Sequence, residues 1–164
     1  MRGKAFTPDE VNALIPALRR VLEEVRDRFD AARLHNEKLQ VLDVLWGPKL
    51  LDRTNPDHAG YTQHRAAVES ELDGIQALVA EEITARGIRF PPGGLEYGLL
   101  DFPTTIDGRW AYLCWQVDEP EVSAWHELDA GFAGRRLLTV ELAARMGRRE
   151  EAPRRAGDPA DGSE

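Results

Sequence analysis

Apolar residues in the first half of the chain recur at intervals of three and four, in two stretches that are much longer than an average helix. The first stretch starts at Val11, continues through Leu39 and Leu42, and stops at Gly47-Pro48. The second runs from Tyr61 to Ile83. Such spacing places apolar side chains on one face of an α-helix. The sequence therefore predicts an antiparallel helical hairpin over residues 7–87, with coiled-coil-like packing.

Capping signals support both helices. Thr7-Pro8-Asp9-Glu10 has the pattern of a capping box, with proline at the first helical position. Pro16 lies within the first pattern, where we expect a kink. Asn55-Pro56-Asp57 resembles a second helix start, and Gly87 is placed to end that helix as a left-handed cap.

The periodicity changes after Gly87. The run Pro91-Pro92-Gly93-Gly94 interrupts regular structure, and strand patterns follow at residues 95–102, 109–117 and 121–128. Asp107-Gly108 is a strong signal for a hairpin turn. The sequence thus predicts an α+β fold in which the helical hairpin precedes a three-stranded antiparallel β-meander over residues 95–128. We expect a single domain over residues 5–146, whose C-terminal segment, 129–146, carries a short helix at 137–146. Residues 147–164, which are charged and rich in proline and glycine, are predicted to be a disordered tail.

The composition limits the partners. The 164-residue chain has a formal net charge of -8, which argues against a nucleic-acid-binding surface because such surfaces rely on Lys and Arg to neutralise phosphates. Its single cysteine, Cys114, excludes an intramolecular disulfide. No apolar stretch approaches the roughly 20 residues of a membrane span, and no signal-like apolar run follows Met1. We expect a cytoplasmic protein that binds neither nucleic acid nor membranes.

Several motifs carry a family resemblance. They are the opening Phe6-Thr7-Pro8-Asp9-Glu10-Val11-Asn12-Ala13-Leu14, then Leu100-Asp101-Phe102-Pro103, Asp107-Gly108-Arg109, Leu113-Cys114-Trp115, and Trp125-His126-Glu127-Leu128-Asp129-Ala130-Gly131-Phe132-Ala133-Gly134-Arg135. Over about residues 5–138 the chain resembles the bacterial and archaeal family called domain of unknown function 2203. It departs at Asp118-Glu119, where the family more often has glycine before the glutamate. The resemblance implies a fold and recurring residues, and it implies no activity.

The strand pattern also places polar residues together. If the first hairpin turns through residues 104–107, Asp101 faces Trp110; if the second turns at Glu119, Tyr112 faces His126. One face of the meander then carries polar and aromatic side chains, namely Asp101, Trp110, Tyr112, Cys114 and His126. We expect Asp101, Arg109 and His126 to converge beside the Gly131–Arg135 loop, around a cavity open to solvent.

A histidine beside carboxylates can hold a divalent metal, or act as a base that an acid orients. The candidate ligand-binding residues are Asp101, Arg109, Tyr112, His126, Glu127, Asp129 and Arg135, and the candidate metal ligands are His126 and Asp101. A divalent metal is the cofactor that such a cluster would take. The competing interpretation is structural: His126 is a hydrogen-bonded core residue, and Asp101 with Arg109 is an ion pair that closes a hairpin.

The remaining candidates are weaker. Cys114 lies between Leu113 and Trp115, and its flanks predict a buried thiol more readily than a nucleophile or metal ligand. His35, His58 and His64 fall within the predicted helices, where we expect surface positions. Residues 131–136 could present backbone amides and guanidinium groups to an anion, although they lack the context of a phosphate-binding loop.

Two functions remain open. The first is a non-enzymatic binding or assembly module that forms a homodimer through its hairpin, with an interface that includes Leu18, Val25, Leu72 and Val79. The second is a small metal-binding protein or acid/base enzyme that uses the His/Asp/Arg cluster. No motif of known chemistry is present in the sequence, which favours the first function and leaves catalytic residues unassigned.

Overall fold

A computed structural model of the chain describes residues 3–147, and these residues divide into two compact units. One unit combines residues 3–15 with residues 87–147, and the other comprises residues 16–86. The division falls at Pro16, within the first helix. Folding of residues 5–146 as a single domain stays a prediction, and the predicted disordered tail lies, from residue 148 onward, outside the described residues.

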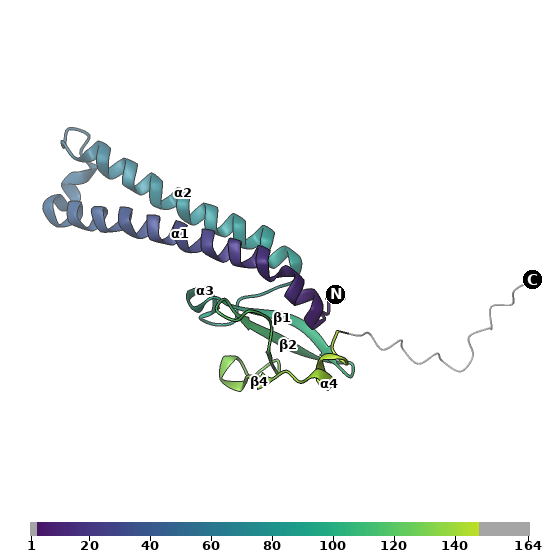
Figure 1. Ribbon diagram of the computed structural model, residues 1–164. Helices are drawn as coiled ribbons and strands as arrows, with labels where there is room; N and C mark the ends of the chain where they lie inside the picture. Colours follow the sequence, from purple (N-terminus) through teal and green to yellow (C-terminus); the bar gives the residue numbers. More distant parts are fainter. Residues whose placement is uncertain (1–2, 148–164) are drawn as a thin grey trace, which may run out of the picture. The chain divides into compact units, whose positions relative to one another are not determined.

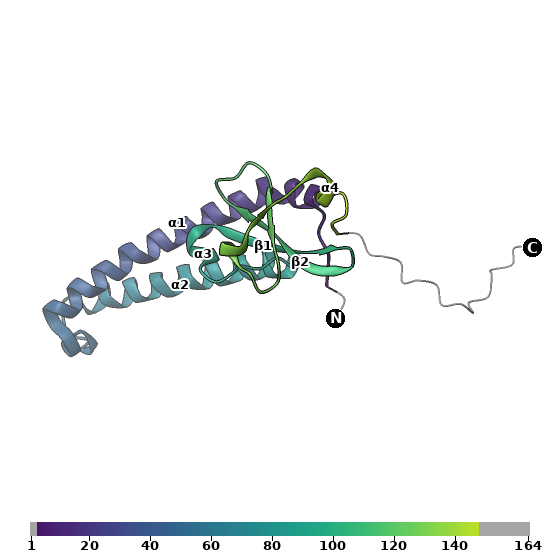
Figure 2. The ribbon, with the colours of Figure 1, turned by 90° about the horizontal axis from the view of Figure 1, so that it is seen from below.

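The predicted helical hairpin is confirmed. Helix α1 spans Pro8–Trp46 and helix α2 spans His58–Glu82, and the two run side by side in both views of Figures 1 and 2. A capping box starts α1: the Glu10 amide donates to Thr7 Oγ1 at 3.2 Å, and the Thr7 amide faces Glu10 Oε1 at 3.4 Å. None of the helices formed by residues 3–147 is long and apolar enough to cross a bilayer.

The end of the hairpin is closed by polar side chains. A short 3-10 helix, Gly47–Leu51, follows α1. The Trp46 indole then donates from Nε1 to Asp57 Oδ2 at 2.7 Å, and the Asp57 amide donates to Asn55 Oδ1 at 2.8 Å. Because residues 55–57 form this turn, α2 begins at His58 rather than near Asn55 as predicted.

The antiparallel sheet has four strands where three were predicted. They are β1, Leu99–Ile106; β2, Arg109–Gln116; β3, Ala124–His126; and β4, Arg136–Leu137, in the order β1-β2-β3-β4. Figure 1 labels β1, β2 and β4. The predicted first strand began too early, because Gly94–Tyr97 forms the short helix α3 and Gly98 takes a positive φ of 67°. Likewise, the predicted helix at 137–146 shortens to α4, Val140–Ala143, since Leu137 pairs in β4.

The register of the first hairpin differs from the prediction by four residues. Asp107 and Gly108 both have positive φ, at 50° and 81°, so they form a two-residue turn that pairs Ile106 with Arg109. Asp101 therefore lies opposite Cys114, not Trp110. A slip by an even number of residues leaves every side chain on its predicted face. The second hairpin has the predicted pairing of Tyr112 with His126.

The other face of β1 packs on the start of the chain. The Phe6 ring meets Phe102 edge-on at 5.6 Å between centroids, and the Phe6 amide donates to the Pro103 carbonyl at 2.7 Å. Thr104, fully buried, donates from Oγ1 to the Phe6 carbonyl at 2.7 Å. This strand-to-terminus contact holds β1 in the core of its unit.

We expect Thr104→Val to lower the free energy of unfolding by about 1–3 kcal/mol, because valine has the same shape but leaves the buried Phe6 carbonyl without its donor. Denaturant titration measures the loss. The matched control is Thr62→Val on the exposed surface of α2, expected to change stability by less than about 0.5 kcal/mol. Equal effects of the two substitutions would contradict the assigned role of the Thr104 hydroxyl.

Candidate metal centre

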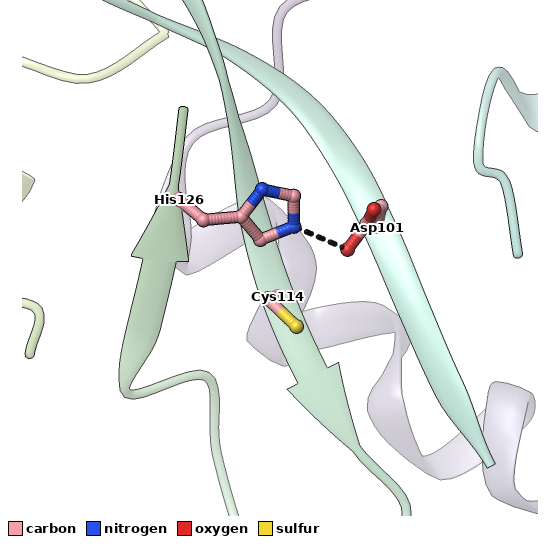
Figure 3. A group of neighbouring side chains, drawn as sticks. All are labelled: Asp101, Cys114 and His126. Atoms are coloured by element: carbon pink, nitrogen blue, oxygen red, sulfur yellow. Dashed lines mark hydrogen bonds and ion pairs between the residues drawn. The ribbon is translucent and has the colours of Figure 1, made fainter. Parts of the chain in front are cut away.

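Three side chains with metal-ligating atoms meet on one face of the sheet. Asp101 comes from β1, Cys114 lies directly opposite it on β2, and His126 comes from β3 (Figure 3). His126 is paired with Tyr112, so its ring reaches diagonally across β2 toward Asp101. The strand pairing thus brings together three residues that are well separated along the chain.

The three ligand atoms lie close together and away from solvent. His126 Nε2 is 3.0 Å from Asp101 Oδ1, and the potential ligand atoms of Asp101, Cys114 and His126 all lie within 4.8 Å of one another. Each of these residues has 0% of its surface exposed. This is the one group of three or more potential metal ligands that residues 3–147 form.

The partly exposed guanidinium group of Arg89 balances the negative charge of the Asp101 carboxylate. Arg89 pairs with Asp101 as an isolated β-bridge, and its Nη2 and Nε lie 3.1 and 3.3 Å from Asp101 Oδ2. The same guanidinium lies over the Tyr112 ring, 3.9 Å from its centroid. Tyr112 in turn lies 5.5 Å from the His126 ring, centroid to centroid. Arg89 and Tyr112 therefore fix the orientation of the carboxylate and of the imidazole.

Both ring nitrogens of His126 face oxygen atoms. Nδ1 lies 2.8 Å from the Glu127 carbonyl, and Nε2 lies 3.0 Å from Asp101 Oδ1. A carbonyl oxygen only accepts, so Nδ1 carries a proton. Nε2 and Asp101 Oδ1 then either share one proton, or both direct lone pairs at a cation held between them. The pair of atoms therefore has a place for one proton or one metal ion.

The thiol of Cys114 is protected by its surroundings. Burial raises the pKa of Cys114 to about 12, and the negative charge of Asp101 adds to the rise, whereas Arg135 opposes it. A thiol with such a pKa is a poor nucleophile at neutral pH. A metal ion in contact with the sulfur would displace the proton and reverse this preference.

Two predicted members of the site lie elsewhere. Arg109 pairs with Ile106 at the hairpin turn, five residues along β1 from Asp101, which is roughly 17 Å at the rise of a strand. Arg109 and Glu127 line a separate pocket of about 450 Å³, together with Trp110 and Trp125. The predicted convergence of Asp101, Arg109 and His126 around an open cavity is therefore wrong, and it failed because the turn lies at 107–108.

The remaining predicted residues also have identified positions. Tyr112 borders the cluster, whereas Asp129 is exposed in the turn after β3. Arg135 donates from Nη2 to the Cys114 carbonyl at 3.1 Å and to Glu119 Oε1 at 2.5 Å. Its guanidinium is thus engaged in the protein, and it braces the strand that carries Cys114.

The sequence interpretation missed one residue and underrated another. Arg89 is the guanidinium partner of Asp101, a role that had been expected of Arg109. The available signal was the alternation Ile88-Arg89-Phe90 between a helix-ending glycine and a proline, which indicates a short extended segment. Cys114 belongs to the cluster because the corrected register places it opposite Asp101.

In metal-free protein, we expect stability to fall between pH 9 and about 12 partly through Cys114. The folded state retains the thiol proton in this range, whereas an unfolded thiol with its ordinary pKa of 9.0 loses it, so rising pH favours unfolding. The slope from one such group approaches about 1.4 kcal/mol per pH unit. Denaturant titrations of wild type and Cys114→Ala in the presence of a chelator isolate this contribution. Parallel pH profiles for the two proteins would refute it.

Comparison with known proteins places the chain in a family. The model of the family described as "Uncharacterized conserved protein (DUF2203)" matches residues 4–138. No curated protein and no solved structure matches the chain. The matched range includes both long helices, all four strands and every member of the Asp101–Cys114–His126 cluster. The match covers most of the 164 residues, so the chain belongs to the uncharacterised conserved family DUF2203.

Proposed function

We propose that this protein binds a transition-metal ion, with Zn²⁺ as the reference ion, through Asp101, Cys114 and His126. The observation that carries the proposal is the meeting of a carboxylate, a thiol and an imidazole within 4.8 Å at a buried point. Oxygen, sulfur and nitrogen are the ligands that Zn²⁺ takes in proteins, and a thiolate favours softer ions over Mg²⁺ or Ca²⁺.

The surrounding hydrogen bonds support this proposal. A metal-bound histidine usually donates its second ring nitrogen to a carbonyl or carboxylate, as His126 Nδ1 does toward the Glu127 carbonyl. Arg89 occupies Asp101 Oδ2 and leaves Oδ1 directed at His126 Nε2. Those two atoms are 3.0 Å apart and need to separate only to about 3.4 Å to become adjacent tetrahedral ligands of an ion whose bonds are about 2.0–2.2 Å long.

Burial favours metal binding over acid/base catalysis. A general base must come within hydrogen-bond reach of a substrate proton. Asp101, Cys114 and His126 expose none of their surface, so a substrate the size of a metabolite has no direct path to them. A bare ion needs only a small opening. The compartment stays a prediction: a reducing cytoplasm would keep the Cys114 thiol available as a ligand.

Untagged protein purified without chelator is expected to contain about one equivalent of zinc by elemental analysis. Metal-free protein titrated with Co²⁺ should develop the visible bands of a low-symmetry cobalt site and a thiolate-to-cobalt charge-transfer band. Cys114 is the sole cysteine, so that band can come from no other residue. Cys114→Ser should abolish the band, and Asp101→Asn and His126→Ala should abolish tight binding. Arg89→Gln should weaken binding roughly 10- to 100-fold, because Arg89 only orients the carboxylate.

Asp129→Asn is the matched control for Asp101→Asn, since Asp129 is an exposed carboxylate just after β3. It should bind Co²⁺ as wild type does. The competing structural interpretation makes a different forecast: no bound metal, no charge-transfer band, and a loss of about 1–3 kcal/mol in unfolding free energy for His126→Ala. That combination would rule out the metal centre.

A second function, homodimer formation, is supported by apolar surface on the hairpin. Large apolar side chains are exposed along the distal half of α1, where Leu34, Val41 and Leu45 follow at intervals of seven and four. These intervals place them on one helix face. Val44 beside them is 87% exposed. We propose that a second copy of this chain covers this stripe, because Arg33, Glu37 and Lys38 alternate in sign beside it and can pair across a two-fold axis.

The interface expected from the sequence needs correction. Leu18 and Val25 are 2% and 3% exposed, so they lie in the interior of the chain and have no surface left for a partner. Leu72 is 46% exposed and remains available. The periodicity identified the apolar residues correctly but could not tell which of them the chain itself covers.

Light scattering at micromolar concentration should report a dimer, and the double substitution Val41→Glu with Leu45→Glu should convert it to a monomer by placing charges in the seam. Leu137→Glu, at an even more exposed apolar position on β4, is the control and should leave the dimer intact. A wild-type protein that stays monomeric at every concentration would contradict this proposal.

A further inference from the structure

Two histidines face each other across the helical hairpin. His35 lies on α1 and His64 on α2, and their Nδ1 atoms are 2.9 Å apart. The ring centroids are 5.2 Å apart, and the planes are tilted by 44°. Both side chains are partly buried. Both rings keep part of their surface exposed, as expected of helix-surface residues, but the pairing of the helices turns them to their shared side.

Two ring nitrogens this close require something between them. One nitrogen can donate a proton to the other, which requires a specific combination of tautomers. Alternatively, both lone pairs can point at one cation. At metal–nitrogen bond lengths of about 2.0–2.1 Å, atoms 2.9 Å apart subtend about 90°, the angle between adjacent ligands in a tetragonal or octahedral site.

We propose that His35 and His64 form a second metal site, a clasp that ties α1 to α2. Imidazole nitrogens suit Ni²⁺, Cu²⁺ and Zn²⁺, and Cu²⁺ binds such sites most tightly. This clasp is independent of the Asp101–Cys114–His126 cluster, because it lies wholly within residues 16–86 and contains no sulfur or carboxylate.

The remaining coordination positions belong to water. Among residues 3–147, no third histidine, cysteine or carboxylate joins this pair, since the one group of three or more such ligands is the sheet cluster. Partial exposure of both rings gives water and ions access. Two protein ligands with bound water make an exchangeable site, weaker than a closed site with four protein ligands.

Metal binding at the clasp stabilises the hairpin. The ion joins residues 35 and 64 only when α1 and α2 are packed, so it binds the folded state and not the unfolded chain. The clasp lies on the same half of the hairpin as the exposed stripe of Leu34, Val41 and Leu45. An ion there fixes the helices that present this stripe.

Ni²⁺ is the probe, because it does not oxidise the Cys114 thiol. Untagged full-length protein is titrated with Ni²⁺ in a non-coordinating buffer, with calorimetry to measure binding and thermal denaturation to measure stability. Wild-type protein should bind Ni²⁺ at the clasp with micromolar affinity, and its melting temperature should rise. His35→Gln and His64→Gln should each weaken that binding by on the order of 100-fold, since each removes the partner held at high effective concentration. Circular dichroism establishes that both variants remain helical.

His58→Gln is the matched control, as His58 lies on the same hairpin but its Nδ1 faces the Leu50 carbonyl at 2.7 Å. This variant should bind Ni²⁺ as wild type does. Two outcomes overturn the clasp. One is unchanged binding in His35→Gln and His64→Gln, and the other is loss of all Ni²⁺ binding in His126→Ala, which would assign the ion to the sheet. The Co²⁺ charge-transfer band tests the sheet cluster separately, since His35 and His64 supply no thiolate.

Discussion

The two-residue turn at Asp107-Gly108 is the constraint on which the chemistry of the sheet depends. Both residues take positive φ, a conformation that glycine adopts freely and aspartate tolerates. Once Ile106 pairs with Arg109, each following pair is fixed, as far as Leu99 with Gln116. Asp101 then has Cys114 as its direct partner. A slip of one residue would turn Asp101 to the opposite face of β1, where Phe6 packs, and the cluster would not form.

The fixed register buries charge, which requires compensation. Moving one ion from water into a protein interior carries a penalty of several kcal/mol even after relaxation. Asp101 is fully buried, and it has Arg89 on Oδ2 and His126 on Oδ1. If either partner is removed, part of the negative charge of Asp101 stays buried without compensation. The same need for compensation favours binding of a cation at the cluster. A metal ion would supply positive charge beside the oxygen, sulfur and nitrogen atoms of the three side chains.

The fold was predictable where its signals are local. Periodicity and the Thr7–Glu10 capping box identified α1 to its first residue, since helix contacts span only three or four residues. The strand ends were not predicted correctly: residues 104–106 were assigned to the turn, although β-branched residues favour strands, because the two-residue turn at Asp107-Gly108 was read as a longer loop. Thr104 belongs to β1 because it pairs with Ala111 of β2, and its side chain adds a hydrogen bond to Phe6, which is distant in sequence.

The residues of the candidate site were likewise predictable only where their signals are local. Asp101 and His126 were identified because a register error of an even number of residues leaves each side chain on its predicted face of the sheet. Arg109 was wrongly included, and Arg89 was missed, because the partner of Asp101 comes from an isolated bridge that no turn signal announces. The meeting of His35 and His64 was equally hidden. It depends on how two helices rotate and slide against each other, and the stripe of each helix alone leaves that alignment open.

The unequal strengths of the strands suggest how an ion would reach a fully buried cluster. β1 and β2 share eight residue pairs, whereas β3 pairs with β2 at three positions and with β4 at two. Both residues of β4 are exposed, so it adds little apolar burial to hold that edge. Separating β3 from β2 breaks three residue pairs, whereas separating β1 from β2 breaks eight, and β3 carries His126. Asp101 and Cys114 would stay paired while the imidazole moves out and returns. In this arrangement the rigid hairpin presents two ligands and the weakly held strand supplies the third, so an ion bound by all three would also stabilise the edge of the sheet.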